Sequence, residues 1–338
     1  MRVLQIGYQQ LRRYGHTRVS WTQKLHYGLV KNDHFVHSFS DRDVAAFEAP
    51  LRLRDLGRQR ANRLLLETAE AVEPDLVIVG HADIITNETL EGIRDRVRGV
   101  VIAHCNNDPL FVPENVDRIA HRAAAVDAVF VSTGVRELER FAGIGARLYH
   151  MPNSVDASIE RFDASGCSEL PIDLIFCSNS EKYSERLAIV SHLRDHLSDE
   201  LKFDIFGCFG RPPIWGLDYD RALARSSMGL NLNRQEGLYW YSSARMAQLG
   251  GNGVLTFVHS SGGFQDLFPS ETLVYFDSNE HLLAQIRAFS ADDAKRRTWA
   301  SNTRRFFHAE LNSTHHAQYI VEAAMERPHS HEYAWHRR

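Results

Sequence analysis

Cysteine and long apolar runs are both scarce in this sequence. Its 338 residues include four cysteines, Cys105, Cys167, Cys177 and Cys208, and no two of them form a CxxC pair. This argues against a structural zinc site and is typical of a reduced, cytosolic protein. No apolar run reaches the roughly 18 residues of a membrane-spanning helix, and the N-terminus MRVLQIG turns polar too soon for a signal peptide. We therefore expect a cytoplasmic protein.

A strong charge imbalance and familiar ligand-binding spacings are missing as well. The formal net charge is −4, so no nucleic-acid partner is expected. The 18 histidines form no HExxH or similar spacing, and we predict no metal site. Gly7 and the pair Gly207 and Gly210 fall short of the GxGxxG fingerprint of dinucleotide-binding proteins.

Short apolar segments alternate with helical patterns along the whole chain, which predicts mostly parallel, doubly wound α/β sheets. In the first half we expect strands at Val3–Ile6, His34–Phe39, Leu76–Val79, Val100–Ala103, Ala128–Val131 and Leu148–Met151. In the second half we expect them at Ile172–Cys177, Phe203–Phe206, Gly229–Leu232, Gly253–Val258 and Leu273–Phe276. The helical patterns between them include Asp55–Val72 and Val135–Ala142.

The alternation lapses between Pro152 and Pro171, and a chain of this length exceeds what one core usually fills. We therefore expect two Rossmann-like domains, residues 1–155 and 170–312, facing a cleft that holds the ligand. A last helix and polar tail, residues 313–338, are expected to pack back toward the N-terminal domain.

The stretch from Gly229 to Thr256 is the most informative part of the chain. It predicts a strand, a polar loop, a helix capped by Ser242 or Ser243, and a second strand. Arg245 follows one turn inside that helix, and a guanidinium group there suits a diphosphate. Arg234 is a second cationic candidate, although surface arginines are common.

Glycines after other strands offer backbone donors. Gly262 and Gly263 follow the Gly253–Val258 strand, where their N–H groups could bind phosphate. Gly207 follows another strand and would let the backbone approach a nucleotide closely. For Gly207 a simple tight turn explains the sequence equally well.

Polar residues also gather at predicted strand ends in the first half. Asn106, Asn107 and Asp108 follow the Val100–Ala103 strand, and His104 and His81 hold similar positions. A histidine there can act as a general base, because its pKa lies near neutrality. Alternatively, the Asp-Pro pair is a turn and each histidine is an ordinary loop residue.

Several segments of the second half resemble, in order, the group-1-type glycosyltransferases of GT-B fold, in particular the subgroup similar to the CgeB spore-maturation proteins. The family's first strand and arginine-bearing helix resemble IDLIFCSNSEKYSERLAIVSHL, and its second strand and glycine turn resemble FDIFGCFG. The helix leading to an LN-type strand is similar to LDYDRALARSSMGLNLNRQ. The S-x-R-x-x-E-x-x-x-x-G block resembles SSARMAQLGGNGVLT, and the next strand and helix resemble TLVYFDSNEHLLAQIR. The pieces HCNNDP and VFVST look like the N-terminal half of such proteins.

The resemblance implies a GT-B enzyme that moves a sugar from a nucleotide-sugar donor to a glycan, lipid-linked or protein acceptor, with no metal ion and no cofactor. It assigns donor binding in the C-terminal domain to Gly207, Asn231, Asn233, Arg234, Ser243, Arg245, Gln248, Gly262 and Gly263. Acceptor binding falls to Gln9, His81, Asn106 and Asn107. Asp108 or His104 is the candidate base if the reaction inverts. A retaining reaction needs no such base, and the sequence leaves the two open.

One position departs from the family pattern. Gln248 stands where the family usually carries a glutamate that binds the ribose hydroxyls of the donor. Glutamine keeps hydrogen-bonding capacity but loses the charge-assisted contact, so the identity of the donor nucleotide stays open.

Two other functions remain. A sugar-nucleotide epimerase or hydrolase of GT-B fold would use the same cleft, and a non-catalytic module in polysaccharide or envelope assembly would be consistent with Gln248. Peripheral membrane contact is also left open by Arg58, Arg60 and Arg63 and by Arg337 and Arg338, although such charges usually form a solvated face.

Overall fold

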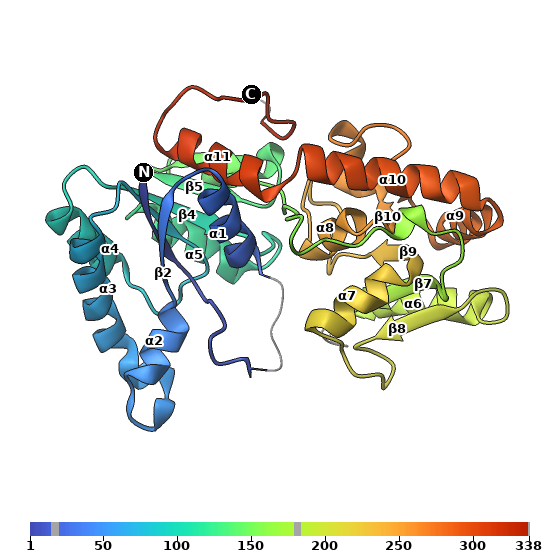
Figure 1. The fold of residues 1–338 in the computed structure, drawn as a ribbon, viewed down its shortest axis with the longest axis horizontal. Helices are drawn as coiled ribbons and strands as arrows, with labels where there is room; N and C mark the ends of the chain where they lie inside the picture. Colours follow the sequence, from blue (N-terminus) through green and yellow to red (C-terminus); the bar gives the residue numbers. More distant parts are fainter. Residues whose placement is uncertain (15–19, 179–183, 337–338) are drawn as a thin grey trace. The chain divides into compact units, whose positions relative to one another are not determined.

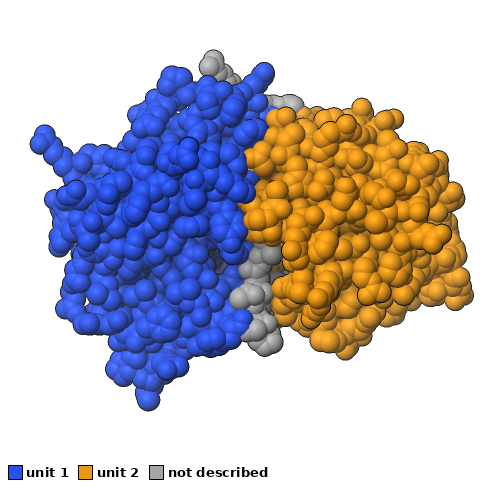
Figure 2. All heavy atoms as spheres, in the orientation of Figure 1, with its two compact units in different colours: residues 1–152, 313–338 blue, residues 153–312 orange. Residues whose placement is uncertain are grey.

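The computed structural model describes residues 1–14, 20–178 and 184–336, and the chain divides into two compact units. Unit 1 combines Met1–Pro152 with Ser313–Arg338, and unit 2 is Asn153–Asn312 (Figure 2). Each unit contains one parallel sheet flanked by helices (Figure 1). The predicted α/β class with two Rossmann-like sheets is therefore confirmed. No helix among the described residues is both long and apolar enough to cross a lipid bilayer.

Unit 1 has a six-stranded parallel sheet in the order β2-β1-β3-β4-β5-β6. Its strands are β1 (Arg2–Ile6), β2 (Phe35–Phe39), β3 (Leu76–Val79), β4 (Val101–Asn106), β5 (Ala128–Val131) and β6 (Arg147–His150). Its helices are α1 (Trp21–Lys31), α2 (Asp41–Phe47), α3 (Arg58–Val72), α4 (Asn87–Arg96), α5 (Pro113–Ala123) and α11 (Ser313–Ala324). The inner strands β3 and β5 are buried along their whole length, as expected for a parallel sheet covered on both faces.

Three expectations for unit 1 need correction. The predicted strand at Val100–Ala103 continues to Asn106, because Cys105 and Asn106 pair with β5, so His104 and Asn106 lie in a strand and not in a loop. The predicted helix at Val135–Ala142 is a 3₁₀ helix, η4 (Val135–Phe141). The predicted helix Asp55–Val72 is split into the 3₁₀ turn η3 (Arg54–Gly57) and α3.

Unit 2 has a five-stranded parallel sheet in the order β11-β10-β9-β7-β8. Its strands are β7 (Ile172–Cys177), β8 (Phe203–Phe206), β9 (Ser226–Asn231), β10 (Leu255–His259) and β11 (Val274–Phe276). Its helices are α6 (Ser184–Leu197), α7 (Gly216–Ala224), α8 (Ala244–Gly251), α9 (Asn279–Ala291) and α10 (Asp293–Ala309). Large apolar side chains from β7, β9, β10 and β11 pack against α6 and α9 to form its main core.

The C-terminal helix α11 is an integral part of unit 1. It lies along α1 and also contacts β4 and β5 (Figure 1). Asn32 Nδ2 donates to the Thr314 carbonyl at 2.9 Å, and Arg147 Nη2 donates to the Ala324 carbonyl at 2.8 Å. The tail then folds back over α11, where Tyr333 donates to the buried Glu322 carboxylate at 2.8 Å. These contacts join segments that lie far apart in the sequence, so local sequence patterns do not predict them.

Replacing Gly28 with alanine should destabilise unit 1. The new Cβ would lie 2.0 Å from the Ser313 carbonyl oxygen, so α1 and α11 would have to separate. Overpacking of this kind costs about 2–3 kcal/mol, and we expect a lower Tm in thermal unfolding followed by circular dichroism.

Gly92→Ala is the matched control, because Gly92 also lies inside a helix. Its new Cβ would meet only the mobile ends of Leu66 and Arg96, at 3.1 and 3.2 Å. Alanine favours a helix over glycine by about 1 kcal/mol, so this variant should match or exceed the wild-type Tm. Equal losses of Tm in both variants would contradict the close α1–α11 packing.

Candidate functional site

The strand order of unit 2 marks the position of its candidate site. β7 pairs with β8 on one side and with β9 on the other, so the chain reverses its direction across the sheet between β7 and β9. In open α/β sheets, ligands bind beyond the carboxyl ends of the strands at such a point. Here those ends are Cys177 and Asn231.

Arg245 occupies this point. Its Nε donates to the Cys177 carbonyl at 3.1 Å, and its Nη1 donates to the Leu232 carbonyl at 2.9 Å. One guanidinium group thus joins the ends of β7 and β9. No carboxylate of the described residues lies within ion-pair distance of it, and its Nη2 makes no hydrogen bond there. Arg245 therefore presents an uncompensated positive charge and a spare donor at the strand ends.

Arg186 brings a second guanidinium group to the end of β7, and the sequence-based assignment missed it. It lies on α6, is nearly fully buried, and donates through Nη2 to Ser178 Oγ at 2.7 Å. The guanidinium carbons of Arg186 and Arg245 lie 5.6 and 5.4 Å from the centre of the same ring, Phe176. The sequence signal for Arg186 was the arginine on the helix that follows the first strand of unit 2. Residues 179–183, between that strand and helix, lie outside the described part of the chain.

The N-terminus of α8 differs from the predicted cap. Ser243 holds the cap position, but its hydroxyl donates to Asn231 Oδ1 at 2.7 Å and accepts no helix amide. Asn231 is fully buried, and its Nδ2 has no partner among the described residues. The first turn of α8 thus has no side-chain cap. Met246 N–H donates to the Ser243 carbonyl at 3.1 Å, which leaves the two amides before it and the helix dipole for an anion.

Gln248 is held by Tyr219 of α7. The buried Tyr219 hydroxyl donates to Gln248 Oε1 at 3.1 Å, and burial raises the pKa of that hydroxyl well above its usual range. Tyr219 therefore acts as a donor at any physiological pH. This interaction fixes the oxygen of the amide and leaves its Nε2 group for another partner.

The loop after β9 forms its own network. The Asn233 backbone N–H and Nδ2 both donate to Glu236, at 2.8 and 3.0 Å. Asn233 is therefore held by the loop itself, and Arg234 beside it is exposed to solvent.

Two glycines of the predicted donor site, Gly263 and Gly207, have backbone N–H groups that are already engaged within the protein. Gly263 N–H donates to the Ser260 carbonyl at 3.1 Å. Gly207 N–H donates to the carbonyls of Arg211 and Pro212, at 3.0 and 3.2 Å. Gly207 has a positive φ, and a Cβ there would lie 1.8 Å from the Ser178 carbonyl oxygen. Close packing against the end of β7 therefore accounts for this glycine.

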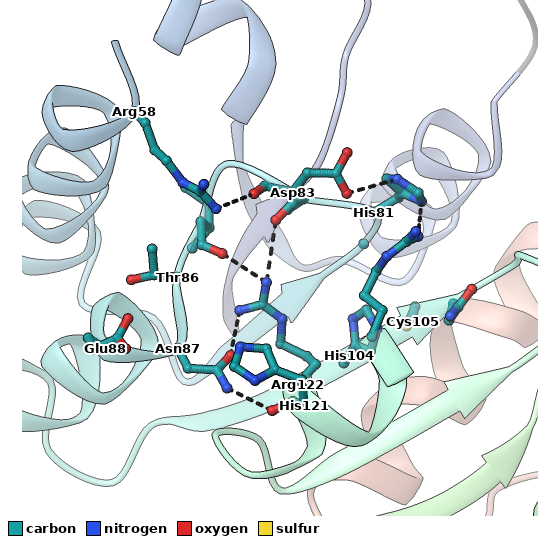
Figure 3. Close-up of a pocket in the computed structure, with 15 residues that line it drawn as sticks. Arg58, His81, Asp83, Thr86, Asn87, Glu88, His104, Cys105, His121 and Arg122 are labelled. Carbon is teal, nitrogen blue, oxygen red and sulfur yellow. Dashed lines mark hydrogen bonds and ion pairs between the residues drawn. The ribbon is translucent and has the colours of Figure 1, made fainter. Parts of the chain in front are cut away.

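Unit 1 contains a cavity of about 710 Å³ beyond the carboxyl ends of β3 and β4 (Figure 3). Its lining comes from these strand ends, the loop before α4, and α5. The predicted residues His81, His104 and Asn106 are brought together here. Gln9 is not, because it lines a separate cavity of about 480 Å³ beside β2 and α1.

A chain of alternating charges runs along one wall of the cavity. His81 Nδ1 bonds to Asp108 Oδ2 at 2.7 Å. Its Nε2 bonds to Asp83 Oδ1 at 2.9 Å (Figure 3). Arg42 pairs with Asp83 at 2.6 Å, and Arg118 pairs with Asp108 at 3.0 Å. Hydrogen bonds to Asp108 and Asp83 raise the pKa of His81 to about 9. At neutral pH His81 is therefore a cation with both N–H groups engaged.

Asp108 is correspondingly a weak base. Burial opposes its ionisation, but the hydrogen bond and charge of His81, together with Arg118, hold its pKa below the usual range. Its backbone N–H also donates to Asn106 Oδ1 at 2.6 Å, so Asn106 shapes the turn after β4. Asn107 Oδ1 is buried with no partner among the described residues.

His104 has the opposite electrostatics. It is 3% exposed, and its Nδ1 lies 3.0 Å from the Val79 carbonyl oxygen, so this nitrogen carries the proton. Burial, assisted by the charge of Arg122, lowers its pKa to about 3. Nε2 consequently keeps an unprotonated lone pair, and no described residue donates to it. This nitrogen is itself buried, and the depressed pKa makes His104 a poor general base at neutral pH.

Arg122 adds positive charge behind the cavity. It is 8% exposed, and its donors go to Asn87 Oδ1 at 2.9 Å and to the Ile85 carbonyl at 2.8 Å, with no carboxylate partner among the described residues. It therefore holds the loop before α4 in place (Figure 3).

Comparison with known proteins shows which protein family and which solved structures the chain resembles. Residues 186–322 match a family model described as glycosyl transferase-like. Sucrose-phosphate synthase from Thermosynechococcus elongatus has a TM-score of 0.65 and 12% identity, over 96% of this chain and 99% of that one. Trehalose-6-phosphate synthase OtsA has a TM-score of 0.62 and 12% identity, over 97% of this chain and 100% of that one. A search of curated proteins found no match.

The fold is GT-B. A third similar structure, HepE from Anabaena in complex with UDP-glucose, has a TM-score of 0.61 and 13% identity, over 96% of this chain and 99% of that one. The family match in unit 2 and the GT-B fold of the whole chain together support a glycosyltransferase.

The pKa of His81 predicts a loss of stability at alkaline pH. Its folded pKa of about 9 exceeds the ordinary value of 6.5. The stabilisation is therefore complete below pH 6.5 and disappears as the pH rises through 9. The side chain is 42% exposed, so we expect solvent screening to limit the effect to about 1 kcal/mol.

Urea unfolding of the wild type and His81→Gln across this pH range measures the effect. The stability difference between the two proteins should shrink as the pH rises. Titration of the His81 ring by NMR supplies a direct check, with His34 as the internal control because burial lowers its pKa. A His81 midpoint near that of a free histidine would refute the charge chain.

Proposed function

We propose that this protein transfers a sugar from a nucleotide-sugar donor to a glycan, lipid-linked or protein acceptor, without a metal ion or cofactor. The observation that carries the proposal is Arg245 at the reversal point of a glycosyl transferase-like unit. Its spare donor, the charge of Arg186 and the uncapped start of α8 together suit a leaving diphosphate. Membership of the CgeB-like subgroup stays a prediction.

The donor in this proposal is a uridine diphosphate sugar. HepE, whose fold is similar, is described in complexes with UDP and with UDP-glucose. In unit 2, Gln248 would meet the ribose through its Nε2 group, because Tyr219 already occupies its oxygen. Asn231 Nδ2 is a further unused donor near the diphosphate position. Asn233, Arg234 and Gly262 complete the predicted donor set, with support from sequence alone.

The acceptor would bind in the cavity of unit 1. Its walls carry Arg58, Arg118 and Arg122, whose side chains suit a polar or anionic acceptor group. Both predicted bases, Asp108 and His104, have depressed pKa values. This favours retention, in which the bond from the sugar C1 to the donor phosphate breaks while the acceptor oxygen bonds to C1 from the same face. The acceptor proton then passes to the departing phosphate oxygen. Trehalose-6-phosphate synthase, also similar in fold, is described as transferring with retention.

Thermal unfolding with a nucleotide panel tests the donor assignment. UDP should raise the Tm more than GDP, CMP or dTDP, because a ligand of the native state adds stability. Arg245→Ala should weaken UDP binding roughly 30- to 150-fold, the effect of about 2–3 kcal/mol for a lost charge-assisted contact. Arg221→Ala is the control, since Arg221 is exposed on α7 and lies 3.9 Å from Asp218.

The outcomes separate the alternatives. If no nucleotide changes the Tm, the non-catalytic module is the better description. If UDP binds but Arg245→Ala binds it equally well, the diphosphate assignment is wrong. Release of free sugar or of an epimer, with no transfer to any acceptor, would identify a hydrolase or epimerase.

Gln248→Glu tests the departure from the family pattern. The carboxylate can still accept from Tyr219 and offers its second oxygen to the ribose hydroxyls, so UDP affinity should rise about tenfold, or roughly 1.4 kcal/mol. Isothermal titration calorimetry measures the change, with Tyr219→Phe as a companion that frees the oxygen of Gln248. If Gln248→Glu binds UDP more weakly than the wild type, the ligand accepts a hydrogen bond from Nε2 and needs the amide.

A further inference from the structure

A short projection of unit 1 exposes an unusual number of apolar side chains. We call residues 47–56 the tip; it contains the end of α2, the 3₁₀ turn η2 (Pro50–Arg52) and most of η3 (Figure 1). Phe47 is 54% exposed, Leu51 89%, Leu53 54% and Leu56 62%. Elsewhere in the described chain the large exposed apolar residues are Leu11, Tyr14, Val30, Phe35 and Leu217. Nearly half of them thus fall within ten consecutive residues.

The fold holds the tip in this exposed form. Leu51 and Arg52 both have left-handed backbone conformations, with φ of 60° and 57°, which are costly for residues with a side chain. The base of the tip is tightly packed, since a Cβ on Gly57 would lie 1.8 Å from the Ala45 carbonyl oxygen. Ala45 and Ala46 are buried beneath it. The exposed leucines are therefore attached to a tightly packed base.

Positive charge surrounds these leucines. Residues 47–63 contain five arginines against Glu48 and Asp55, a net charge of +3 in a chain of net charge −4. Arg60 pairs with Glu48, and Arg54 lies 3.7 Å from Asp55. Arg52 is exposed between Leu51 and Leu53 and forms no ion pair within the described structure. Within the tip itself the charges balance, because Arg52 and Arg54 offset Glu48 and Asp55. The surplus comes from Arg58, Arg60 and Arg63 at the adjoining start of α3.

Exposed leucines alternating with arginines match the chemistry of one surface in particular. Apolar side chains enter the boundary between headgroups and acyl chains, while guanidinium groups stay at the level of the phosphates. Anionic lipids add attraction for every basic residue near the surface. A second copy of the chain is the alternative occupant, and the vesicle experiment distinguishes it from a membrane. We propose that the tip docks unit 1 on a membrane surface that contains anionic lipids.

This docking is independent of the proposed sugar transfer, because the tip lies outside the residues assigned to the donor and acceptor. The predicted basic residues Arg60 and Arg63 follow the tip on α3, where Arg60 pairs with Glu48 and Arg63 lies 3.8 Å from Glu67. Arg337 and Arg338 lie outside the described residues.

Co-sedimentation of the full chain with lipid vesicles tests the proposal. We expect binding to vesicles of phosphatidylcholine with phosphatidylglycerol, little binding to pure phosphatidylcholine, and weaker binding at high salt, since salt screens the attraction. The variant Leu51→Ser/Leu53→Ser/Leu56→Ser should reduce binding about tenfold or more. The variant Arg52→Ser/Arg54→Ser should reduce binding to anionic vesicles and lower its salt dependence.

Leu217→Ser is the matched control, because Leu217 is an exposed leucine of unit 2 and should bind vesicles as the wild type does. All variants should keep the wild-type Tm and UDP response, which separates loss of docking from loss of folding or of the donor site. Failure of the wild type to bind anionic vesicles would overturn the proposal, as would undiminished binding by the leucine variant. Equal binding to neutral vesicles would refute the role of charge. If the wild type forms a dimer and does not bind vesicles, and the leucine variant is a monomer, the tip binds a second copy of the chain instead.

Discussion

Arg245 joins the carboxyl ends of β7 and β9, and the candidate site of unit 2 depends on this one guanidinium group. Two adjacent parallel strands direct their last carbonyls to the same edge, where the backbone offers only acceptors. The half-buried Arg245 guanidinium satisfies these carbonyls and leaves positive charge facing outward. Arg186 brings a second guanidinium group over the same Phe176 ring. An anion at this edge would therefore meet preorganised positive charge.

In unit 1, burial and hydrogen-bond partners give two nearby imidazole rings opposite charge states. His81 lies between two carboxylates, which keep its ring charged, whereas His104 lies inside the sheet edge, where desolvation keeps its ring neutral. The charged ring uses both nitrogens to hold Asp108 and Asp83 in place. The neutral ring keeps its unprotonated nitrogen buried beside the cavity. Both predicted bases, Asp108 and His104, have depressed pKa values, so the cavity suits binding more than proton removal.

Chain connectivity adds a further constraint. Unit 1 is completed by α11, which arrives after the whole of unit 2 and packs so closely on α1 that Gly28 has no room for a side chain. The tail adds Tyr333 and Trp335, both buried, to the surface of α11. Unit 1 therefore cannot be complete until the last residues of the chain are present. Any division of the protein at the boundary near Pro152 would separate α1 from its partner.

The sequence by itself determined the α/β class, the eleven strands of the described chain and the position of Arg245 at the start of a helix after a strand, because strand periodicity and the residues after a strand are local information. It did not reveal the role of Tyr219 in holding Gln248, the bonds that occupy the amides of Gly207 and Gly263, or the opposite charge states of His81 and His104. Each of these depends on partners brought together only by folding: Tyr219 lies 29 residues from Gln248, and Asp108 lies 27 residues from His81. Hydrogen-bond partners and burial decide whether a polar residue is available to a ligand, and the tertiary structure alone sets both.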